Sequence, residues 1–248
     1  MAEIVAAFGV PHTPNFPALV AKQGPECRTA QLYAQVAALL HDASPDVLVI
    51  YTDDHFNTFF LDNFPTFAVG IADQISGPND QTAMPSYRVG GEASLASHVR
   101  ARVIAAGFDL SLVQDFDLDH SIMVPLHFLT PDMAIPIVPV FINGLAPPLP
   151  SARRCSALGH AVKDAIEDWP ADKRVAVPSA TTSTTYSTSD CQALKQLDDE
   201  IPDVKSSSSD IFGKRAKAVA TGFSETADKV DDKRHDAVAL PHVAVALA

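Results

Sequence analysis

Two short apolar segments near the N-terminus each lead to a histidine. Residues 47–51 (VLVIY) lead through two aspartates to His55, and residues 4–10 (IVAAFGV) lead through Pro11 to His12. Short segments that are apolar on both faces are typical of buried strands in a parallel sheet. If both are parallel strands joined by a helix, the two histidines emerge at one edge of the sheet, where α/β proteins bind ligands. Two imidazoles at that edge make a metal site the first hypothesis.

The rest of the chain alternates further strands with helices. The spacing of apolar residues predicts helices with one buried face over residues 26–43, 92–106 and 152–168. Further strands are expected over 64–71, 110–113, 135–142 and 174–177. The prolines in residues 135–142 indicate an edge or kinked strand. Loop residues accumulate in two places, which predicts a Pro-rich loop over residues 14–25 and a long surface loop or lid over 72–91.

The composition changes after Pro178. Residues 180–189 (ATTSTTYSTS) and 206–209 are of low complexity, and the C-terminal stretch is mostly Ala, Val, Lys and Asp. Such a composition does not build a firm core by itself. Either this third of the chain is a loosely packed tail, or the true side chains differ here from those in this sequence.

Charge and cysteine content indicate which partners and which cellular compartment this protein has. The formal net charge is -12, with 18 basic against 30 acidic residues and no basic block, which argues against nucleic acid or an anionic membrane surface as the main partner. Three cysteines lie far apart without a CxxC motif, which favours a reducing compartment; they are Cys27, Cys155 and Cys191. Glu3 stands where a signal peptide carries positive charge, and the apolar run 133–142 is too short to span a bilayer. We therefore expect a soluble cytoplasmic protein.

Histidines are the main candidates for chemistry, because the motifs of nucleotide binding, zincin-type proteolysis and α/β-hydrolases are absent. Three of the nine histidines lie within expected helices and are expected to be structural or solvent-facing: His41, His98 and His160. For His12 and His55 the alternative to metal binding is a pair of hydrogen-bonded loop histidines. His120 follows an aspartate at an expected strand end, so it is a third candidate, as a metal ligand or a proton-transfer residue.

Several sequence blocks in order carry a resemblance to a known family. They are Phe8–Pro14, Asp54–Phe60 with Pro65–Gly70, Asp119–His120 with Val124–Leu126, Ile137–Gly144 and Pro148–Cys155. These blocks resemble the class III extradiol ring-cleaving dioxygenases, which include the protocatechuate 4,5-dioxygenase catalytic β subunit and 2,3-dihydroxyphenylpropionate dioxygenase. The resemblance covers residues 2–177 and implies a single α/β catalytic domain over residues 1–248. That domain is built around a mixed central sheet with helices on both faces.

The resemblance also implies a cofactor and roles for individual residues. The family holds mononuclear Fe(II) with two histidines and one carboxylate, and by position His12 and His55 are the histidine ligands. The nearest counterpart of the carboxylate ligand is Glu225, in the stretch Gly-Phe-Ser-Glu. His120 matches a family histidine with an acid/base role. Such a facial triad leaves coordination positions open for a catechol and O2.

This chain departs from the family pattern at two places. The family has a second catalytic histidine in a Gly-Gly-x-Ser-His context, whereas here Thr185 falls near its place. Threonine is not a base at neutral pH, which puts proton abstraction from the catechol in doubt. Either the true side chains after Pro178 differ and the enzyme is intact, or the chain has kept the fold and lost part of the site. Asp53 or Asp54 is the alternative carboxylate ligand, although adjacency to His55 makes simultaneous ligation awkward.

The leading hypothesis is an extradiol dioxygenase acting with O2 on a carboxylated catechol such as protocatechuate, gallate or a dihydroxyphenyl acid. Arg88, Arg153 or a partner subunit would meet the substrate carboxylate. The resemblance implies an oligomer and a small helical partner subunit. One alternative is a non-catalytic, metal-binding or protein-interaction relative of the same fold, as in the Memo-like branch. Another is a hydrolase in which His12, His55 and an aspartate bind Zn²⁺.

Overall fold

The strands form one mixed sheet. The computed structural model describes residues 1–80 and 83–181. Six of their strands pair in the order β1 (Glu3–Pro11), β8 (Arg174–Thr181), β2 (Val47–Thr52), β7 (Ile137–Ile142), β3 (Phe67–Gly70) and β6 (Ser111–Val113). The first four strands are parallel, whereas β3 and β6 run the opposite way because β3 pairs antiparallel to β7. The predicted α/β fold with a mixed central sheet is confirmed.

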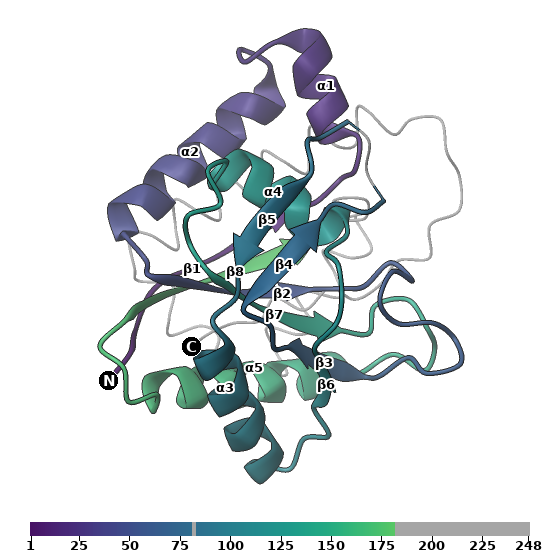
Figure 1. Ribbon diagram of the computed structural model, residues 1–248, viewed down its shortest axis with the longest axis vertical. Helices are drawn as coiled ribbons and strands as arrows, with labels where there is room; N and C mark the ends of the chain where they lie inside the picture. Colours follow the sequence, from purple (N-terminus) through teal and green to yellow (C-terminus); the bar gives the residue numbers. More distant parts are fainter. Residues whose placement is uncertain (81–82, 182–248) are drawn as a thin grey trace.

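Helices cover both faces of this sheet (Figure 1), as predicted. One face carries α1 (Phe16–Gln23), α2 (Arg28–Ala43) and α4 (His120–Leu129), and the other carries α3 (Ala93–Ala105) and α5 (Ala152–Glu167). Alternate residues of β2 enter the two cores: Leu48 and Ile50 join the first, and Val47, Val49 and Tyr51 join the second. This explains why β2 is apolar from Val47 to Tyr51. A single domain over residues 1–248 stays a prediction, because 182–248 lie outside the described residues.

Two of the predicted loops contain regular structure. Helix α1 lies within the predicted loop 14–25, where Pro17 occupies the first turn and removes no helical hydrogen bond. The predicted loop 72–91 contains a hairpin of β4 (Gln74–Gly77) and β5 (Tyr87–Gly90). Ile75 and Val89 anchor the hairpin because both are buried in the first core.

His120 begins a helix and does not lie at a strand end, so that prediction was wrong. Asp119 caps α4 by accepting a hydrogen bond from the backbone N–H of Ser121 at 2.8 Å. The apolar residues after the cap pack in the first core, which lies between α2, α4 and the sheet. Pro125 lies among them, and because proline is rare inside helices it hides the helical pattern in the sequence.

Of the two alternatives predicted for residues 135–142, an edge strand or a kinked one, the edge position was wrong. Strand β7 lies between β2 and β3 in the middle of the sheet. Its register with β3 pairs Val140 with Val69, which places Pro139 across from Gly70. A side chain at Gly70 would come within 2.8 Å of the Pro139 ring, so the glycine makes room for a proline inside the sheet.

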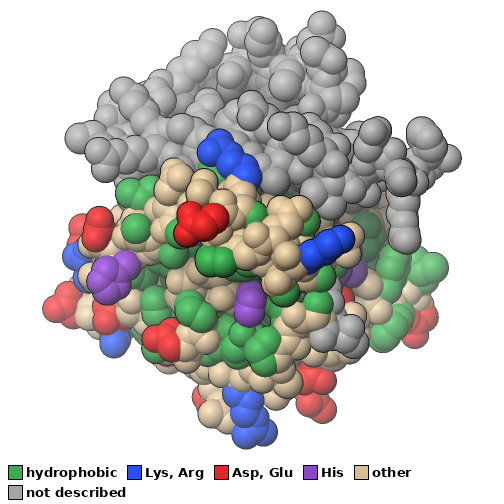
Figure 2. Space-filling model, turned by 90° about the horizontal axis from the view of Figure 1, so that it is seen from above, with side chains coloured by type: hydrophobic (Ala, Val, Ile, Leu, Met, Phe, Trp, Pro, Cys, Tyr) green, Lys and Arg blue, Asp and Glu red, His purple; other side chains and the backbone are tan. Residues whose placement is uncertain are grey.

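The described surface shows no large basic patch on the face seen in Figure 2, where Lys and Arg side chains are scattered singly. This distribution matches the formal net charge of -12. The longest described helices, α2 and α5, have 16 residues each. No described helix is both long enough and apolar enough to cross a membrane.

The β4–β5 hairpin lies close to the segment that precedes α4. Leu118 donates its N–H to Ser76 at 2.8 Å, and its carbonyl accepts from the N–H of Asn79 at 3.2 Å. Gly77 makes this approach possible, because a Cβ at that position would lie 2.7 Å from the carbonyl oxygen of Leu118. The hairpin is thereby held against the residues that lead into His120.

We predict that Gly77→Ala destabilises the protein by about 1–3 kcal/mol, because the added methyl group overpacks this contact. The matched control is Gly90→Ala on β5, where the nearest atom to the new Cβ would be Pro136 Cβ at an ordinary 3.6 Å. Urea unfolding of both variants measures the difference. Equal stability of Gly77→Ala and Gly90→Ala would contradict the packing described here.

Candidate active site

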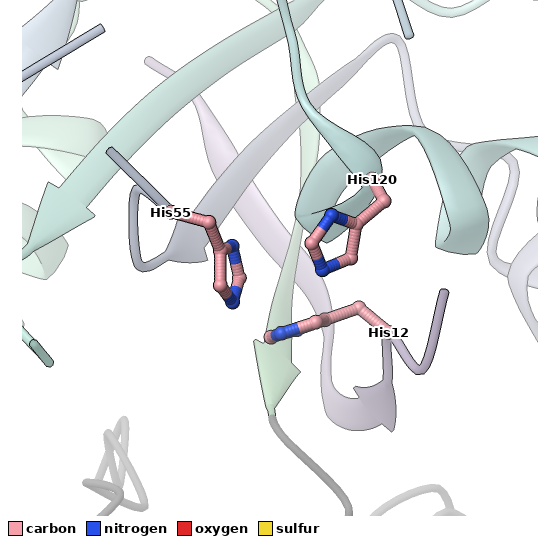
Figure 3. A group of neighbouring side chains, drawn as sticks. All are labelled: His12, His55 and His120. Atoms are coloured by element: carbon pink, nitrogen blue, oxygen red, sulfur yellow. The ribbon is translucent and has the colours of Figure 1, made fainter. Parts of the chain in front are cut away.

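Three histidine rings meet at the carboxyl edge of the parallel strands (Figure 3). His12 follows the last residue of β1, His55 lies in the loop after β2, and His120 is the first residue of α4. The ring centroids are 5.2 Å apart for His12 and His55, 5.6 Å for His12 and His120, and 4.3 Å for His55 and His120. One nitrogen from each ring lies within 4.8 Å of the others. The fold thus brings all three candidate histidines into one cluster.

His12 is the most deeply buried member of the cluster. Its relative exposure is 1%, and neither ring nitrogen has a hydrogen-bond partner among the described residues. Burial lowers the pKa of His12 to about 4, against the raising effect of the nearby Asp53 charge. The ring is therefore neutral at physiological pH and offers a free lone pair, which is the form that binds metals.

His55 is oriented by a carboxylate behind it. Asp119 Oδ2 accepts hydrogen bonds from the backbone N–H of His55 at 3.1 Å and from its Nδ1 at 3.0 Å. Burial acts to lower the pKa of His55, but the hydrogen bond to Asp119 and the charges of Asp53 and Asp119 outweigh it and raise the pKa to about 9. A carboxylate on one ring nitrogen leaves the other directed at the cluster, as is usual for metal-binding histidines.

Asp119 ties this arrangement to the start of α4. Its other oxygen, Oδ1, accepts hydrogen bonds from the backbone N–H and the hydroxyl of Ser121. Burial acts to raise the pKa of Asp119, but the hydrogen bonds from His55 and Ser121 hold it well below its ordinary range. The carboxylate is therefore ionised, and it connects the helix cap to the orientation of His55.

His120 has its own carboxylate partner in Asp80, from the loop after β4. Asp80 Oδ1 accepts from the backbone N–H of His120 at 3.0 Å, and Asp80 Oδ2 lies 2.5 Å from Nδ1. A carboxylate oxygen accepts hydrogen bonds, which places a proton on Nδ1, so in the neutral tautomer of this ring Nε2 is the nitrogen with a free lone pair. In Figure 3 one nitrogen of this ring points toward the other two histidines.

The two aspartates before His55 differ in what they contact. Asp54 accepts hydrogen bonds from the backbone N–H groups of Asn57, Thr58 and Phe59 at 2.9–3.1 Å, and so closes the loop after β2. Burial raises the pKa of Asp54, in opposition to these hydrogen bonds. Asp53 faces the cluster, with Oδ1 3.7 Å from Nε2 of His12 and Oδ2 3.7 Å from Nε2 of His55.

A cavity of about 290 Å³ lies beside the loop after His55. It is lined by Asn57, Thr58, Asn79, Asp115, Phe116 and Asp117. Two of the six lining residues are acidic, so this cavity favours neutral or cationic groups over a carboxylate.

The structure leaves several sequence predictions outside the cluster. Arg88 on β5 and Arg153 on α5 are exposed, on elements that cover opposite faces of the sheet. Glu225 and Thr185 lie outside the described residues, as do His235 and His242.

Asp80 was not predicted from the sequence, because the Gly-Pro-Asn-Asp stretch that contains it is typical of any surface loop. The role of Asp119 could have been predicted from the sequence, because an aspartate directly before an apolar run is typical of a helix N-cap.

Sequence comparisons place the chain among ring-opening dioxygenases. The family model described as the catalytic LigB subunit of aromatic ring-opening dioxygenase matches residues 6–185. The 2,3-dihydroxyphenylpropionate/2,3-dihydroxicinnamic acid 1,2-dioxygenase of Mycobacterium sp. (strain MCS) is 38% identical over 134 residues, which are 54% of this chain and 41% of that protein. The similarly named protein of Klebsiella pneumoniae is 30% identical over 152 residues, 61% of this chain and 48% of that protein.

The matched region spans less than half the length of these two relatives. Among solved structures, an uncharacterized protein, JW3007 from Escherichia coli K12, aligns with a TM-score of 0.41 and 18% identity. That alignment covers 59% of this chain and 52% of the other, and it is too distant to support an inference.

We predict that the stability of the metal-free protein falls as pH rises from 6.5 through about 9. The pKa of His55 is higher in the folded state than the ordinary 6.5, so its protonated pairing with Asp119 stabilises fully below pH 6.5 and is lost on deprotonation. Urea unfolding across this pH range measures the effect. His55→Gln removes the titrating group, so a wild-type profile parallel to that of the variant would contradict the prediction.

Proposed function

Because the chain belongs to the family of the catalytic LigB subunit of aromatic ring-opening dioxygenases, we propose that it is an extradiol dioxygenase that cleaves a catechol-type ring with O2. The observation that carries this proposal is the cluster of His12, His55 and His120 at the carboxyl edge of the sheet. A buried, neutral imidazole with two unpartnered nitrogens is costly to keep unless a ligand completes it.

The cluster fits a divalent metal, and we propose Fe(II). His12 offers a free lone pair, and His55 offers Nε2 once the metal displaces its proton, with Asp119 behind its other nitrogen. Two histidines and one carboxylate with open positions are typical of non-haem Fe(II) oxygenases. The family resemblance points to Glu225 as the carboxylate, and that residue lies outside the described residues. Bound Fe(II) supplies open coordination positions for catechol and O2 and a route for electron density between them.

In this proposal His120 moves the protons. Its Nδ1 is occupied by Asp80, so Nε2 of the neutral ring accepts the proton of a catechol hydroxyl and returns it later in the reaction. The two contacts to Asp80, through the ring and the backbone, hold the imidazole in this orientation. Burial of His12 limits water at its ring nitrogens, which strengthens the polar contacts made there.

For the substrate we propose a catechol with a carboxylate-bearing side chain. The relatives at 30–38% identity are named for 2,3-dihydroxyphenylpropionate and 2,3-dihydroxicinnamic acid. We therefore propose a catechol of this class as the substrate in preference to protocatechuate or gallate. The acidic cavity beside the loop after His55 disfavours the carboxylate end of such a molecule. That end is therefore expected to face away from Asp115 and Asp117.

The first test is turnover. Anaerobic loading with Fe(II), followed by 2,3-dihydroxyphenylpropionate and O2, is expected to give the yellow ring-fission product, measured by visible absorbance. Protocatechuate and gallate complete the panel, and His12→Ala is the control that should give no product. Absence of product from every catechol despite bound metal would favour a non-catalytic relative. Hydrolytic activity with Zn²⁺ and without O2 would favour a hydrolase.

The second test concerns Asp80. Asp80→Asn is expected to lower kcat about 10–100-fold, because the group that orients the His120 ring is lost, with KM little changed. Asp73→Asn is the matched control, since it makes the same charge change at an exposed position beside the same hairpin. Equal kcat values for the two variants, or a loss confined to KM, would show that Asp80 does not position His120.

A further inference from the structure

We propose that Tyr33 of α2 is a positioning residue for His12, because its hydroxyl fixes the peptide unit that leads into this candidate metal ligand. The inference rests on the metal site of the proposed function and does not depend on the ring-cleaving reaction. The feature that carries it is a buried hydrogen bond, which the Tyr33 hydroxyl donates to the carbonyl oxygen of Pro11, directly before His12.

His12 is held differently from the other two histidines of the cluster. The ring of His55 is oriented by its hydrogen bond to Asp119. The ring of His120 is oriented in the same way by Asp80. Among the described residues, neither ring nitrogen of His12 has a hydrogen-bond partner. The direction of this ring is therefore set by the backbone at residue 12 and by the packing around it.

The peptide unit between Pro11 and His12 is fixed through its carbonyl oxygen. Pro11 is the last residue of β1, and because proline has no N–H, the carbonyl is its one backbone polar group. The Tyr33 hydroxyl donates to that oxygen. Because a peptide unit is planar, fixing its oxygen also fixes the direction of the N–H and the position of the Cα of His12.

The chain is also held on the other side of His12. Phe16 donates its backbone N–H to the carbonyl oxygen of Thr13 at 3.1 Å. The Phe16 ring is fully buried and packs edge-on against the ring of Tyr33, with centroids 6.2 Å apart. The turn that carries His12 is thus held directly by Tyr33 before the histidine and by a ring that packs on Tyr33 after it.

Tyr33 also links this turn to the helix that carries His120. Its ring stacks on Phe128 of α4, with centroids 4.5 Å apart and 26° between the ring planes. His120 is the first residue of that helix. Burial raises the pKa of the Tyr33 hydroxyl well above its ordinary value, so the group stays protonated and able to donate. One side chain therefore relates the position of His12 to that of His120.

A second buried tyrosine provides the matched control. Tyr51 of β2 is 1% exposed, as Tyr33 is, but among the described residues the Tyr51 hydroxyl has no hydrogen-bond partner. Tyr33→Phe and Tyr51→Phe therefore remove the same atom from equally buried rings. Only the first substitution breaks a hydrogen bond next to His12.

The experiment titrates Co²⁺ into the metal-stripped protein, with binding measured by calorimetry and by the visible spectrum of bound Co²⁺. Tyr33→Phe is expected to weaken Co²⁺ binding about 10–100-fold, the loss typical of residues that orient a metal ligand, and to change the visible spectrum. Tyr51→Phe is expected to match the wild type in affinity and in spectrum. Urea unfolding of each variant gives its stability separately.

A purely structural role for Tyr33 gives a different pattern. Tyr33→Phe would then unfold at a lower urea concentration, while its folded form would bind Co²⁺ with wild-type affinity and spectrum, and that result would overturn the inference. An equal loss of Co²⁺ binding in Tyr51→Phe would overturn it too, as would no Co²⁺ binding by the wild type.

A second variant serves if Tyr33→Phe does not fold. Phe128→Leu keeps the Tyr33 hydroxyl but removes the ring on which the tyrosine stacks, and it is also expected to change the Co²⁺ spectrum. A wild-type spectrum from Phe128→Leu would in that case count against the inference. Because neither catechol nor O2 is present, Tyr33-dependent Co²⁺ binding without ring cleavage would reject only the dioxygenase activity.

Discussion

The candidate site depends on the parallel pairing of β1 and β2 with β8, which lies between them. The register places Gly9 of β1 and Tyr51 of β2 opposite the same residue, Ser179 of β8. From that common level, His12 is three residues further along one strand, and Asp53 is two residues further along the other. The side chains therefore reach the same edge at nearly the same height. A register shift of one residue would turn the strand side chains to opposite faces and separate them.

Three imidazoles within one cluster would repel one another if all were protonated, and the structure gives each a different environment. His12 is buried without a hydrogen-bonding carboxylate, which lowers its pKa to about 4. His55 shares a proton with the ionised Asp119, which raises its pKa to about 9. Asp119 is also the cap of α4, so the orientation of one candidate ligand is coupled to the start of the helix that carries His120. The site is thus stabilised by the same hydrogen bonds that stabilise the fold.

The sequence pattern predicted those parts of the molecule whose signals are local. Strand β2 was predicted because a strand buried on both faces gives a short continuous run of apolar residues. Helix α5 was predicted because a helix buried on one face gives apolar residues at intervals of three and four. From strand ends alone, His12 and His55 could be expected to meet. The position of β7 could not be predicted, because Pro139 is accommodated by Gly70, which is distant in sequence. Asp80 was missed for the same reason: its partner His120 is 40 residues away, and only the packing of the hairpin against Leu118 brings them together.

The departure from the family pattern after Pro178 changes how the site would work under the proposed function. By the family resemblance Thr185 falls near the place of a second catalytic histidine, so under the proposed function a proton taken from the catechol would fall to His120 among the described candidates. A single imidazole serves both to accept and to return a proton only if its orientation is maintained between the two steps. The paired contacts of Asp80 to the ring and the backbone of His120 provide that constraint. Under the proposed function, the β4–β5 hairpin, which the sequence pattern predicted as a surface loop, would be as necessary to catalysis as the strands that lead to His12 and His55.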